Sequence, residues 1–236
     1  MTAEPEQLGS AAGLTGRVLG AYAHIVARSV TCRWADARGR LLDDEALLSA
    51  FSCASERPAV AVYWIRDALS VVILPYARPV FRRILSGYRL LPDNTLGGRA
   101  SAAYFRDLGG RYRLLALPGS RERLRQLAEV IREPVSCAFA VDGGGPYGHV
   151  GTGLVGLAVA INARILPIAV VATPAFVAAP YSRVRIPLPG SRIAGVVGDS
   201  IAVRRHVDRR HVAEEVKNSL NAIGEAARAL ARSIRR

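Results

Sequence analysis

The residues that could do acid–base chemistry gather around one glycine-rich loop, the stretch DGGGPYGHVGTG from Asp142 to Gly153. Asp142 follows a short apolar run, and His149 lies within the loop. A carboxylate or an imidazole can act as a general base when its pKa lies near the working pH. Asp142 could equally cap backbone N–H groups of its own loop, and a loop or capping histidine is the more ordinary interpretation of His149.

The same stretch holds Gly151, Gly153 and Gly156, which have the Gly-x-Gly-x-x-Gly spacing of a dinucleotide-binding loop. Such a loop needs a strand that runs directly into its first glycine and an acidic residue about 20 positions later. Here the apolar run ends at Asp142, and no Asp or Glu lies between Asp142 and Asp199. The glycines therefore indicate a loop and a helix start where the backbone can approach a ligand closely.

Composition excludes several kinds of site. The three cysteines are far apart and form no Cys-x-x-Cys or Cys/His cluster, so we expect no metal site and no disulfide framework. We also expect no cofactor. The formal net charge of +13 favours an anionic partner, although the same arginines could simply keep the surface soluble. Aromatic residues make up 6% of the chain and do not alternate with the basic ones, which argues against nucleic acid.

Apolar and amphipathic segments alternate along most of the chain, a pattern typical of an α/β domain with a mainly parallel central sheet flanked by helices. Pro75 and Pro79 should break or kink the helical pattern of residues 66–85. The expected strands are residues 59–63, 88–91, 112–117, 136–141, 165–172, 183–186 and 193–197. The other expected helices are residues 12–30, 43–52, 99–108, 120–132, 153–163 and 207–234, of which the first and last are amphipathic.

Four segments, in order along the chain, carry motifs of a known enzyme family. RPAVAVYWIRDAL matches a strand that ends in Trp-His-Gly, and GGRYRLLALPGSRERLRQLAEVI matches an Arg-Gly-Ser-Ser segment and its helix. Asp142-Gly143 matches an Asp-Gly-Pro-Arg-Gly-Pro loop, Gly153 a Lys-Pro-Gly helix start, and Pro167-Ile168-Ala169-Val170 a Pro-Val-Ala-Val strand. Over residues 12–200 the chain thus resembles the lysophospholipid acyltransferase superfamily, and within it a bacterial branch defined as a domain of unknown function. The resemblance implies acyl transfer from acyl-CoA or an acyl carrier protein to a lysolipid hydroxyl.

The chain departs from this pattern at the catalytic position. Trp64 matches the family, but the next residue, where the family has its catalytic histidine, is Ile65, which cannot take a proton from a hydroxyl. Asp67 could serve as the base only with a raised pKa. The candidates for a replacement base are therefore His149, Asp67 and Asp142.

The phosphate-binding cations of the family are missing too. Its loop Arg corresponds to Gly145, its Lys before the helix to Gly151, and the first Arg of its Arg-Gly-Ser segment to Ala116. Losing the base and several cations together indicates a relaxed demand for phosphate binding. The resemblance still implies substrate-binding roles for Trp64, Arg121, Asp142, Gly143 and Gly153.

Both ends of the chain could meet a membrane. Within residues 12–30, one face carries apolar side chains and another carries basic ones, which suits a helix in the membrane interface or an ordinary helix packed on the core. The apolar residues are Leu14, Val18, Ala21, Tyr22 and Ile25, and the basic ones are Arg17, His24 and Arg28. The C-terminal Arg228, Arg232, Arg235 and Arg236 could bind anionic lipid or complement the helix C-terminus. Asn162-Ala163-Arg164 interrupts the apolar run 150–180, which favours a helix and a strand over a membrane span.

We therefore expect a disordered N-terminus at residues 1–11, an acyltransferase-like domain at residues 12–205, and a basic helix at residues 206–236 packed on or beside it. Because the acidic start lacks the basic region of a signal peptide, we expect a cytoplasmic protein, peripheral on the inner face of the cell membrane. The expected partners are an anionic membrane or lipid, an acyl carrier and a protein partner. Two functions stay open: acyl transfer with a non-standard base, and a non-catalytic lipid-binding or protein-assembly module.

Overall fold

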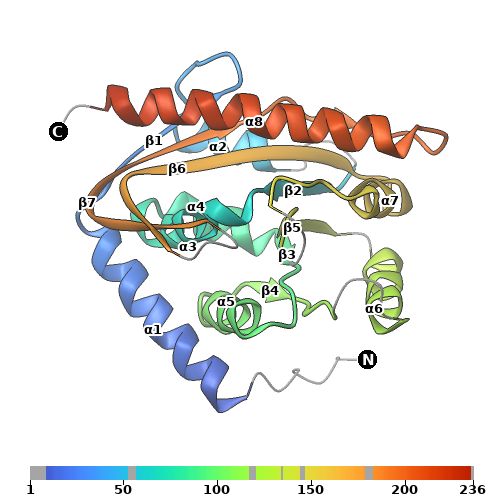
Figure 1. Cartoon of the computed structure of the whole chain (residues 1–236), viewed down its shortest axis with the longest axis horizontal. Helices are drawn as coiled ribbons and strands as arrows, with labels where there is room; N and C mark the ends of the chain where they lie inside the picture. The colour runs from blue at the N-terminus through green and yellow to red at the C-terminus, as the bar shows by residue number, and fades with distance from the viewer. Residues whose placement is uncertain are drawn as a thin grey trace.

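The computed structural model describes residues 9–52, 57–116, 121–133, 135–143, 147–178 and 183–234. Within these residues, one sheet has the strand order β1-β7-β6-β2-β5-β3-β4, and β8 pairs with β6 (Figure 1). Neighbours along that order are parallel except β6 with β7, so the predicted mainly parallel central sheet is confirmed. The strands are β1 Thr31–Asp36, β2 Ala59–Tyr63, β3 Tyr88–Leu90, β4 Arg111–Tyr112, β5 Ser136–Ala140, β6 Arg164–Ala178, β7 Val184–Val197 and β8 Ile201–Ala202.

Helices cover both faces of the sheet, because its central strands are apolar on both sides. In β2, Val60 and Val62 join one core cluster, while Ala59 and Ala61 join the other. On the first face lie α6 Arg121–Arg132, α7 Thr152–Ala160 and α8 Arg209–Ser233. On the second lie α1 Ser10–Ala27, α2 Asp44–Phe51, α3 Ala68–Ala77, α4 Val80–Ser86 and α5 Leu96–Asp107.

The C-terminal helix α8 lies along β6 and β7 (Figure 1). It begins after Asp208, whose side chain accepts hydrogen bonds from the backbone N–H groups of Arg210 and His211. Its predicted apolar stripe packs on the sheet: the buried members are Val212, Val216, Leu220, Ile223, Ala227 and Ile234, and Leu230 is partly buried. The burial of this stripe fixes α8 on one face of the sheet.

Strands β6 and β7 form a longer hairpin than the sequence predicts. The strand expected at residues 165–172 continues to Ala178, and the two late strands expected separately are one strand, β7. Between the two segments the pairing shifts register. Ser191 Oγ connects the two strands where the register shifts. It accepts a hydrogen bond from Leu188 N and donates one to the Pro174 carbonyl.

Several helix boundaries differ from the prediction by up to three residues, for example the start of α5 at Leu96 and the end of α7 at Ala160. Pro79 separates α3 from α4, but Pro75 stays within α3. Helix α1 starts at Ser10, so the last two residues of the segment expected to be disordered are helical, while residues 1–8 lie outside the described part of the chain. No helix in the described ranges has both the length and the apolar character needed to cross a membrane.

Helix α1 packs through its small residues. A Cβ atom added at Gly16 would lie 2.7 Å from the Cβ of Ala103, so the backbones of α1 and α5 approach closely at this point. Three larger apolar side chains of α1 turn outward, while Leu19, Tyr22 and Val26 pack on the core: Leu14 is 58% exposed, and Val18 and Ile25 are each 61% exposed. Most of the apolar stripe that the sequence marks on this helix is therefore a surface feature.

Candidate functional site

The carboxyl ends of β2 and β5 meet, as the sequence predicts. Asp142 follows β5 and accepts hydrogen bonds from the backbone N–H of Ile65, at 2.7 Å, and of Gly148, at 3.1 Å. Ile65 and Asp142 therefore lie next to each other, as expected where two neighbouring parallel strands end. Burial raises the pKa of the buried Asp142 carboxyl, and the two backbone hydrogen bonds oppose this. Because each oxygen accepts a backbone N–H, Asp142 ties the glycine-rich loop to the end of β2.

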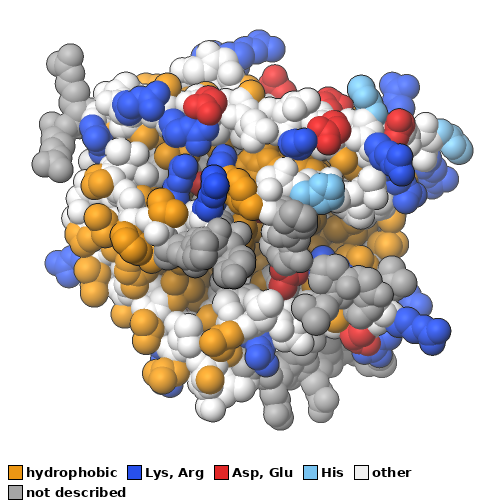
Figure 2. All heavy atoms as spheres, viewed as in Figure 1, with side chains coloured by type: hydrophobic (Ala, Val, Ile, Leu, Met, Phe, Trp, Pro, Cys, Tyr) orange, Lys and Arg blue, Asp and Glu red, His pale blue; other side chains and the backbone are white. Residues whose placement is uncertain are grey.

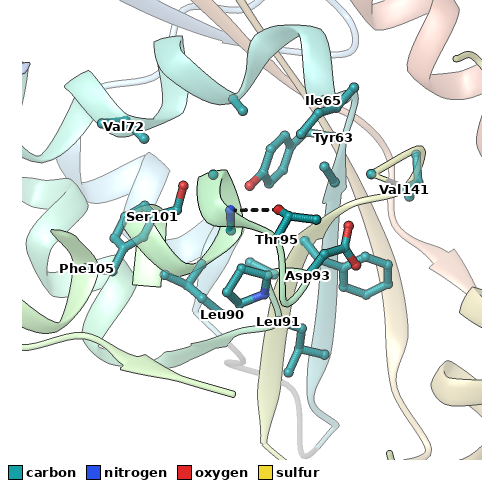
Figure 3. Close-up of a pocket in the computed structure, with 18 of the residues that line it drawn as sticks. Tyr63, Ile65, Val72, Leu90, Leu91, Asp93, Thr95, Ser101, Phe105 and Val141 are labelled. Atoms are coloured by element: carbon teal, nitrogen blue, oxygen red, sulfur yellow. Dashed lines mark hydrogen bonds between the residues drawn. The ribbon is translucent and has the colours of Figure 1, made fainter. Parts of the chain in front are cut away.

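A pocket of about 340 Å³ opens beside Ile65, at the carboxyl ends of β2, β3 and β5. Ligands of open α/β sheets bind at this edge, and the volume is within the range of small-molecule pockets. Helices α3 and α5 form its other wall (Figure 3). Its apolar lining consists mainly of Tyr63, Ile65, Val72, Leu90, Leu91, Phe105, Phe139, Val141 and Val184.

A few polar side chains interrupt this apolar lining. Asp93 Oδ1 lies 3.3 Å from Arg123 Nη1; burial raises the pKa of the Asp93 carboxyl, and Arg123 opposes the rise. Tyr63 and Ser101 turn their hydroxyls into the same space (Figure 3), and neither makes a hydrogen bond with another described residue. Burial raises the pKa of Tyr63 to about 12, so its phenol stays protonated and can donate a hydrogen bond.

None of the three candidates for the replacement base is among the residues that line this pocket. His149 is exposed in the loop that precedes α7. Asp67, in the short 3₁₀ helix η1 Ile65–Asp67, is 1% exposed, and burial raises its pKa to about 6 while Arg66 opposes the rise. Asp67 thus has the raised pKa that a base would need, but Ile65 and Ala68 on either side of it, and not Asp67, line the pocket.

One of the predicted substrate-binding residues lines the pocket, and the others lie outside it. Gly143 lines the pocket, and its Cβ position lies 3.1 Å from Asp93 Oδ2. Trp64 is buried in the core cluster on the opposite face of the sheet. Arg121 is exposed at the start of α6 while Arg123 reaches the pocket, and Gly153 is exposed with open space beside it. Among the positions of the missing cations, Gly145 lies outside the described residues.

No protein-family model and no curated protein sequence matches the chain. Among solved structures, the crystal structure of the 1-acyl-sn-glycerophosphate (LPA) acyltransferase PlsC from Thermotoga maritima overlaps with it. The two are 12% identical, the overlap covers 92% of this chain and 81% of that chain, and the TM-score is 0.48. A similarity at this level carries no argument about the activity of this chain. Any statement about activity therefore has to rest on the residues of the site.

The pocket combines apolar walls with a few groups that can form hydrogen bonds. Its apolar walls suit a hydrocarbon chain, and the hydroxyls of Tyr63 and Ser101 can hydrogen-bond to an ester or a glycerol oxygen. Asp93 is the carboxylate among the described lining residues, and its ion pair with Arg123 favours the charged form. The described residues contain no group of three His, Cys, Asp or Glu side chains that could hold a metal ion.

Proposed function

We propose that this chain is a lysophospholipid acyltransferase-like protein that binds a lipid at a membrane surface without transferring its acyl chain. The observation that carries the proposal is Ile65. Its side chain lines the pocket at the position where the resemblance requires a base, and it cannot accept a proton. None of the three candidates for a replacement base, His149, Asp67 and Asp142, is among the lining residues, whereas the apolar walls that could hold a lipid are present.

The outer surface supports a membrane location. Leu14, Val18 and Ile25 are exposed on α1, Arg17 is exposed on the same helix, and Arg28 is exposed just after its last residue. The β6–β7 hairpin adds the exposed apolar residues Phe176, Val177 and Leu188. Figure 2 shows hydrophobic side chains gathered on the side of the molecule where α1 and the bent hairpin lie in Figure 1.

Tyr22 Oη donates to the Pro187 carbonyl at 2.6 Å, which holds α1 and the hairpin together as one surface. A bilayer is the occupant that suits this surface, because exposed apolar side chains can enter the interface while arginines stay at the headgroups. We propose that the protein is peripheral on the inner face of the cell membrane, where anionic lipids would attract its net charge of +13.

An acyl-transfer assay tests whether the protein lacks acyltransferase activity, as we propose. Wild type, Ile65→His and His149→Ala are incubated with acyl-CoA or acyl carrier protein thioesters and several lysophospholipids. We expect no turnover above the protein-free rate for wild type, since a positioned general base is worth about 10² to 10⁴ in rate. Ile65→His should recover little, because the family's cations are also missing at Gly151 and Ala116, so the substrate phosphate would still be held poorly. Robust wild-type turnover would contradict the proposal, and its loss in His149→Ala would identify the base.

Acyl transfer is the second candidate, and Asp93 is the observation that favours it. This carboxylate lines the pocket, and burial raises its pKa although Arg123 opposes the rise. A carboxylate positioned at the acceptor hydroxyl can act as a general base. The donor would be an acyl thioester and the acceptor a lysolipid hydroxyl. Turnover by wild type that is abolished in Asp93→Asn but kept in His149→Ala would establish this function in place of the first.

A further inference from the structure

A polar site lies across the Ile65–Arg66 segment from the lipid pocket. Ile65 lines the pocket, whereas Arg66 extends toward α8, where its Nη2 atom lies 3.5 Å from the Cβ position of Gly224. Strand β7, which carries Arg185, contacts η1, and Arg228 lies one helical turn beyond Gly224 in α8. Arg66, Arg185 and Arg228, from η1, β7 and α8, therefore lie in the same region of the fold.

Tyr147 extends this group of cations. The Arg66 guanidinium lies 5.4 Å from the centre of the Tyr147 ring, and the Arg183 guanidinium lies 5.7 Å from it. Arg66 also donates a hydrogen bond to the Tyr147 hydroxyl. We call Arg66, Arg183, Arg185 and Arg228 the arginine cluster. Figure 2 shows Lys and Arg side chains gathered on this face, along and just below α8.

Carboxylates neutralise only part of the arginine cluster. Glu225 pairs with Arg228, but Glu225 is exposed on the outer side of α8. Asp67 is buried beside the cluster, yet its Oδ1 makes no hydrogen bond, and the nearest guanidinium atom, Arg66 Nε, is 3.9 Å away. Arg66 Nε is itself buried without a hydrogen-bond acceptor, and Arg185 makes no hydrogen bond or ion pair with another described residue.

Arg66, Arg185 and Arg228 are partly buried, Arg183 is exposed, and Arg66 Nε is a buried donor without an acceptor. Like charges repel one another, and an unsatisfied buried donor is costly, so an anionic acceptor would stabilise the cluster. A ligand with several anionic oxygens supplies this acceptor, and guanidinium groups bind phosphate oxygens in pairs. We propose that the arginine cluster binds a compact dianion of the phosphate-monoester class. This site uses none of the residues that line the lipid pocket, so it does not depend on what the pocket binds.

Titration calorimetry of the full chain tests this directly, with inorganic phosphate and with sulfate, which keeps its charge across the working pH. We expect millimolar or tighter binding of both anions that weakens with added salt. Arg185→Gln should weaken it about tenfold or more, as for loss of a hydrogen bond to a charged group. Asp67→Asn should tighten it about threefold or more, because a negative charge beside the anion is removed.

Arg210→Gln is the matched control, because it makes the same charge change in the exposed first turn of α8, some 18 residues before Arg228. It should leave binding unchanged. The opposite effects of Arg185→Gln and Asp67→Asn exclude general misfolding as their cause. The proposal is overturned if neither anion binds, or if Arg185→Gln behaves like Arg210→Gln.

Vesicles identify the source of the phosphate. Phosphatidylcholine vesicles are prepared with phosphatidic acid, which carries a monoester, or with phosphatidylglycerol, which carries a diester. A loss of preference for phosphatidic acid in Arg185→Gln would identify a lipid headgroup as the ligand. Loss of free-anion binding alone, with vesicle binding unchanged, would identify a soluble phosphate. Both results support the site, and the acyl-transfer assay above tests the proposed function separately.

Discussion

Asp67 should make the folded protein less stable at neutral pH than it would be with a neutral side chain at this position. Burial raises the pKa of this carboxyl from its ordinary 3.8 to about 6; Arg66, Arg185 and Arg228 oppose the rise, and Asp142 adds to it. A folded pKa above the unfolded one means that the folded state holds the extra proton. The free energy of unfolding should therefore fall as the pH rises from about 4 to about 6, and this loss is complete above that range.

The size of the effect follows from the pKa. A rise from 3.8 to about 6 corresponds to about 3 kcal/mol. Asp67→Asn removes the ionisation, so at neutral pH the variant should be more stable than wild type by up to about 3 kcal/mol. Below about pH 4 the difference should vanish, because wild-type Asp67 is then protonated in both states.

Urea unfolding followed by tryptophan fluorescence at several pH values measures this difference, since Trp34 and Trp64 are both buried. Asp199→Asn is the control, because it makes the same change at an exposed residue and should alter stability by less than about 0.5 kcal/mol. A variant Asp67→Asn that is less stable than wild type at neutral pH would refute the reasoning. A carboxylate that destabilises the fold is expected where function needs it, which is consistent with its place beside the arginine cluster.

Other substitutions test the packing and the surface. Gly16→Ala should destabilise the protein by about 1–3 kcal/mol in thermal or urea unfolding, because the added Cβ would overlap Ala103. Gly13→Ala is the control, since open space lies beside Gly13, and it should not destabilise the protein. Val18→Gln should weaken flotation with anionic vesicles while leaving the melting temperature unchanged, because Val18 is exposed. For wild type, equal flotation with neutral and anionic vesicles that does not change with salt would contradict the electrostatic contribution. Asp142→Ala should cost about 2–4 kcal/mol in urea unfolding, because it leaves the Ile65 and Gly148 N–H groups without their acceptor.

Strong periodicity made much of the fold predictable. The apolar stripe of α8 and the buried run of β2 each indicate one element and one orientation, and both form as expected. Strand β1 was missed, because only Trp34 and Ala35 of its six residues are buried and Arg33 and Asp36 break the pattern. The outward turn of Leu14, Val18 and Ile25 could not be predicted either, since α1 packs on α5 through small residues such as Gly16.

The candidate site, too, could be predicted from the sequence only in part. The proximity of Ile65 and Asp142 follows from the rule that parallel strands end at one edge of the sheet. Arg123 lines the pocket and Arg121 does not, because two residues differ by about 200° around a helix and the sequence does not fix the rotation of α6. Asp93 and Ser101 belong to no motif, and the fold alone brings them to the pocket.

Mass spectrometry of lipids that copurify with the gently purified protein tests the central claim, that the pocket beside Ile65 holds a lipid. Ser101→Leu fills the pocket without removing a hydrogen bond, and Ser49→Leu makes the same change on the exposed side of α2. Wild type and Ser49→Leu should retain an acyl-chain lipid that Ser101→Leu has lost. Absence of lipid from wild type, or equal lipid content in all three proteins, would contradict the account.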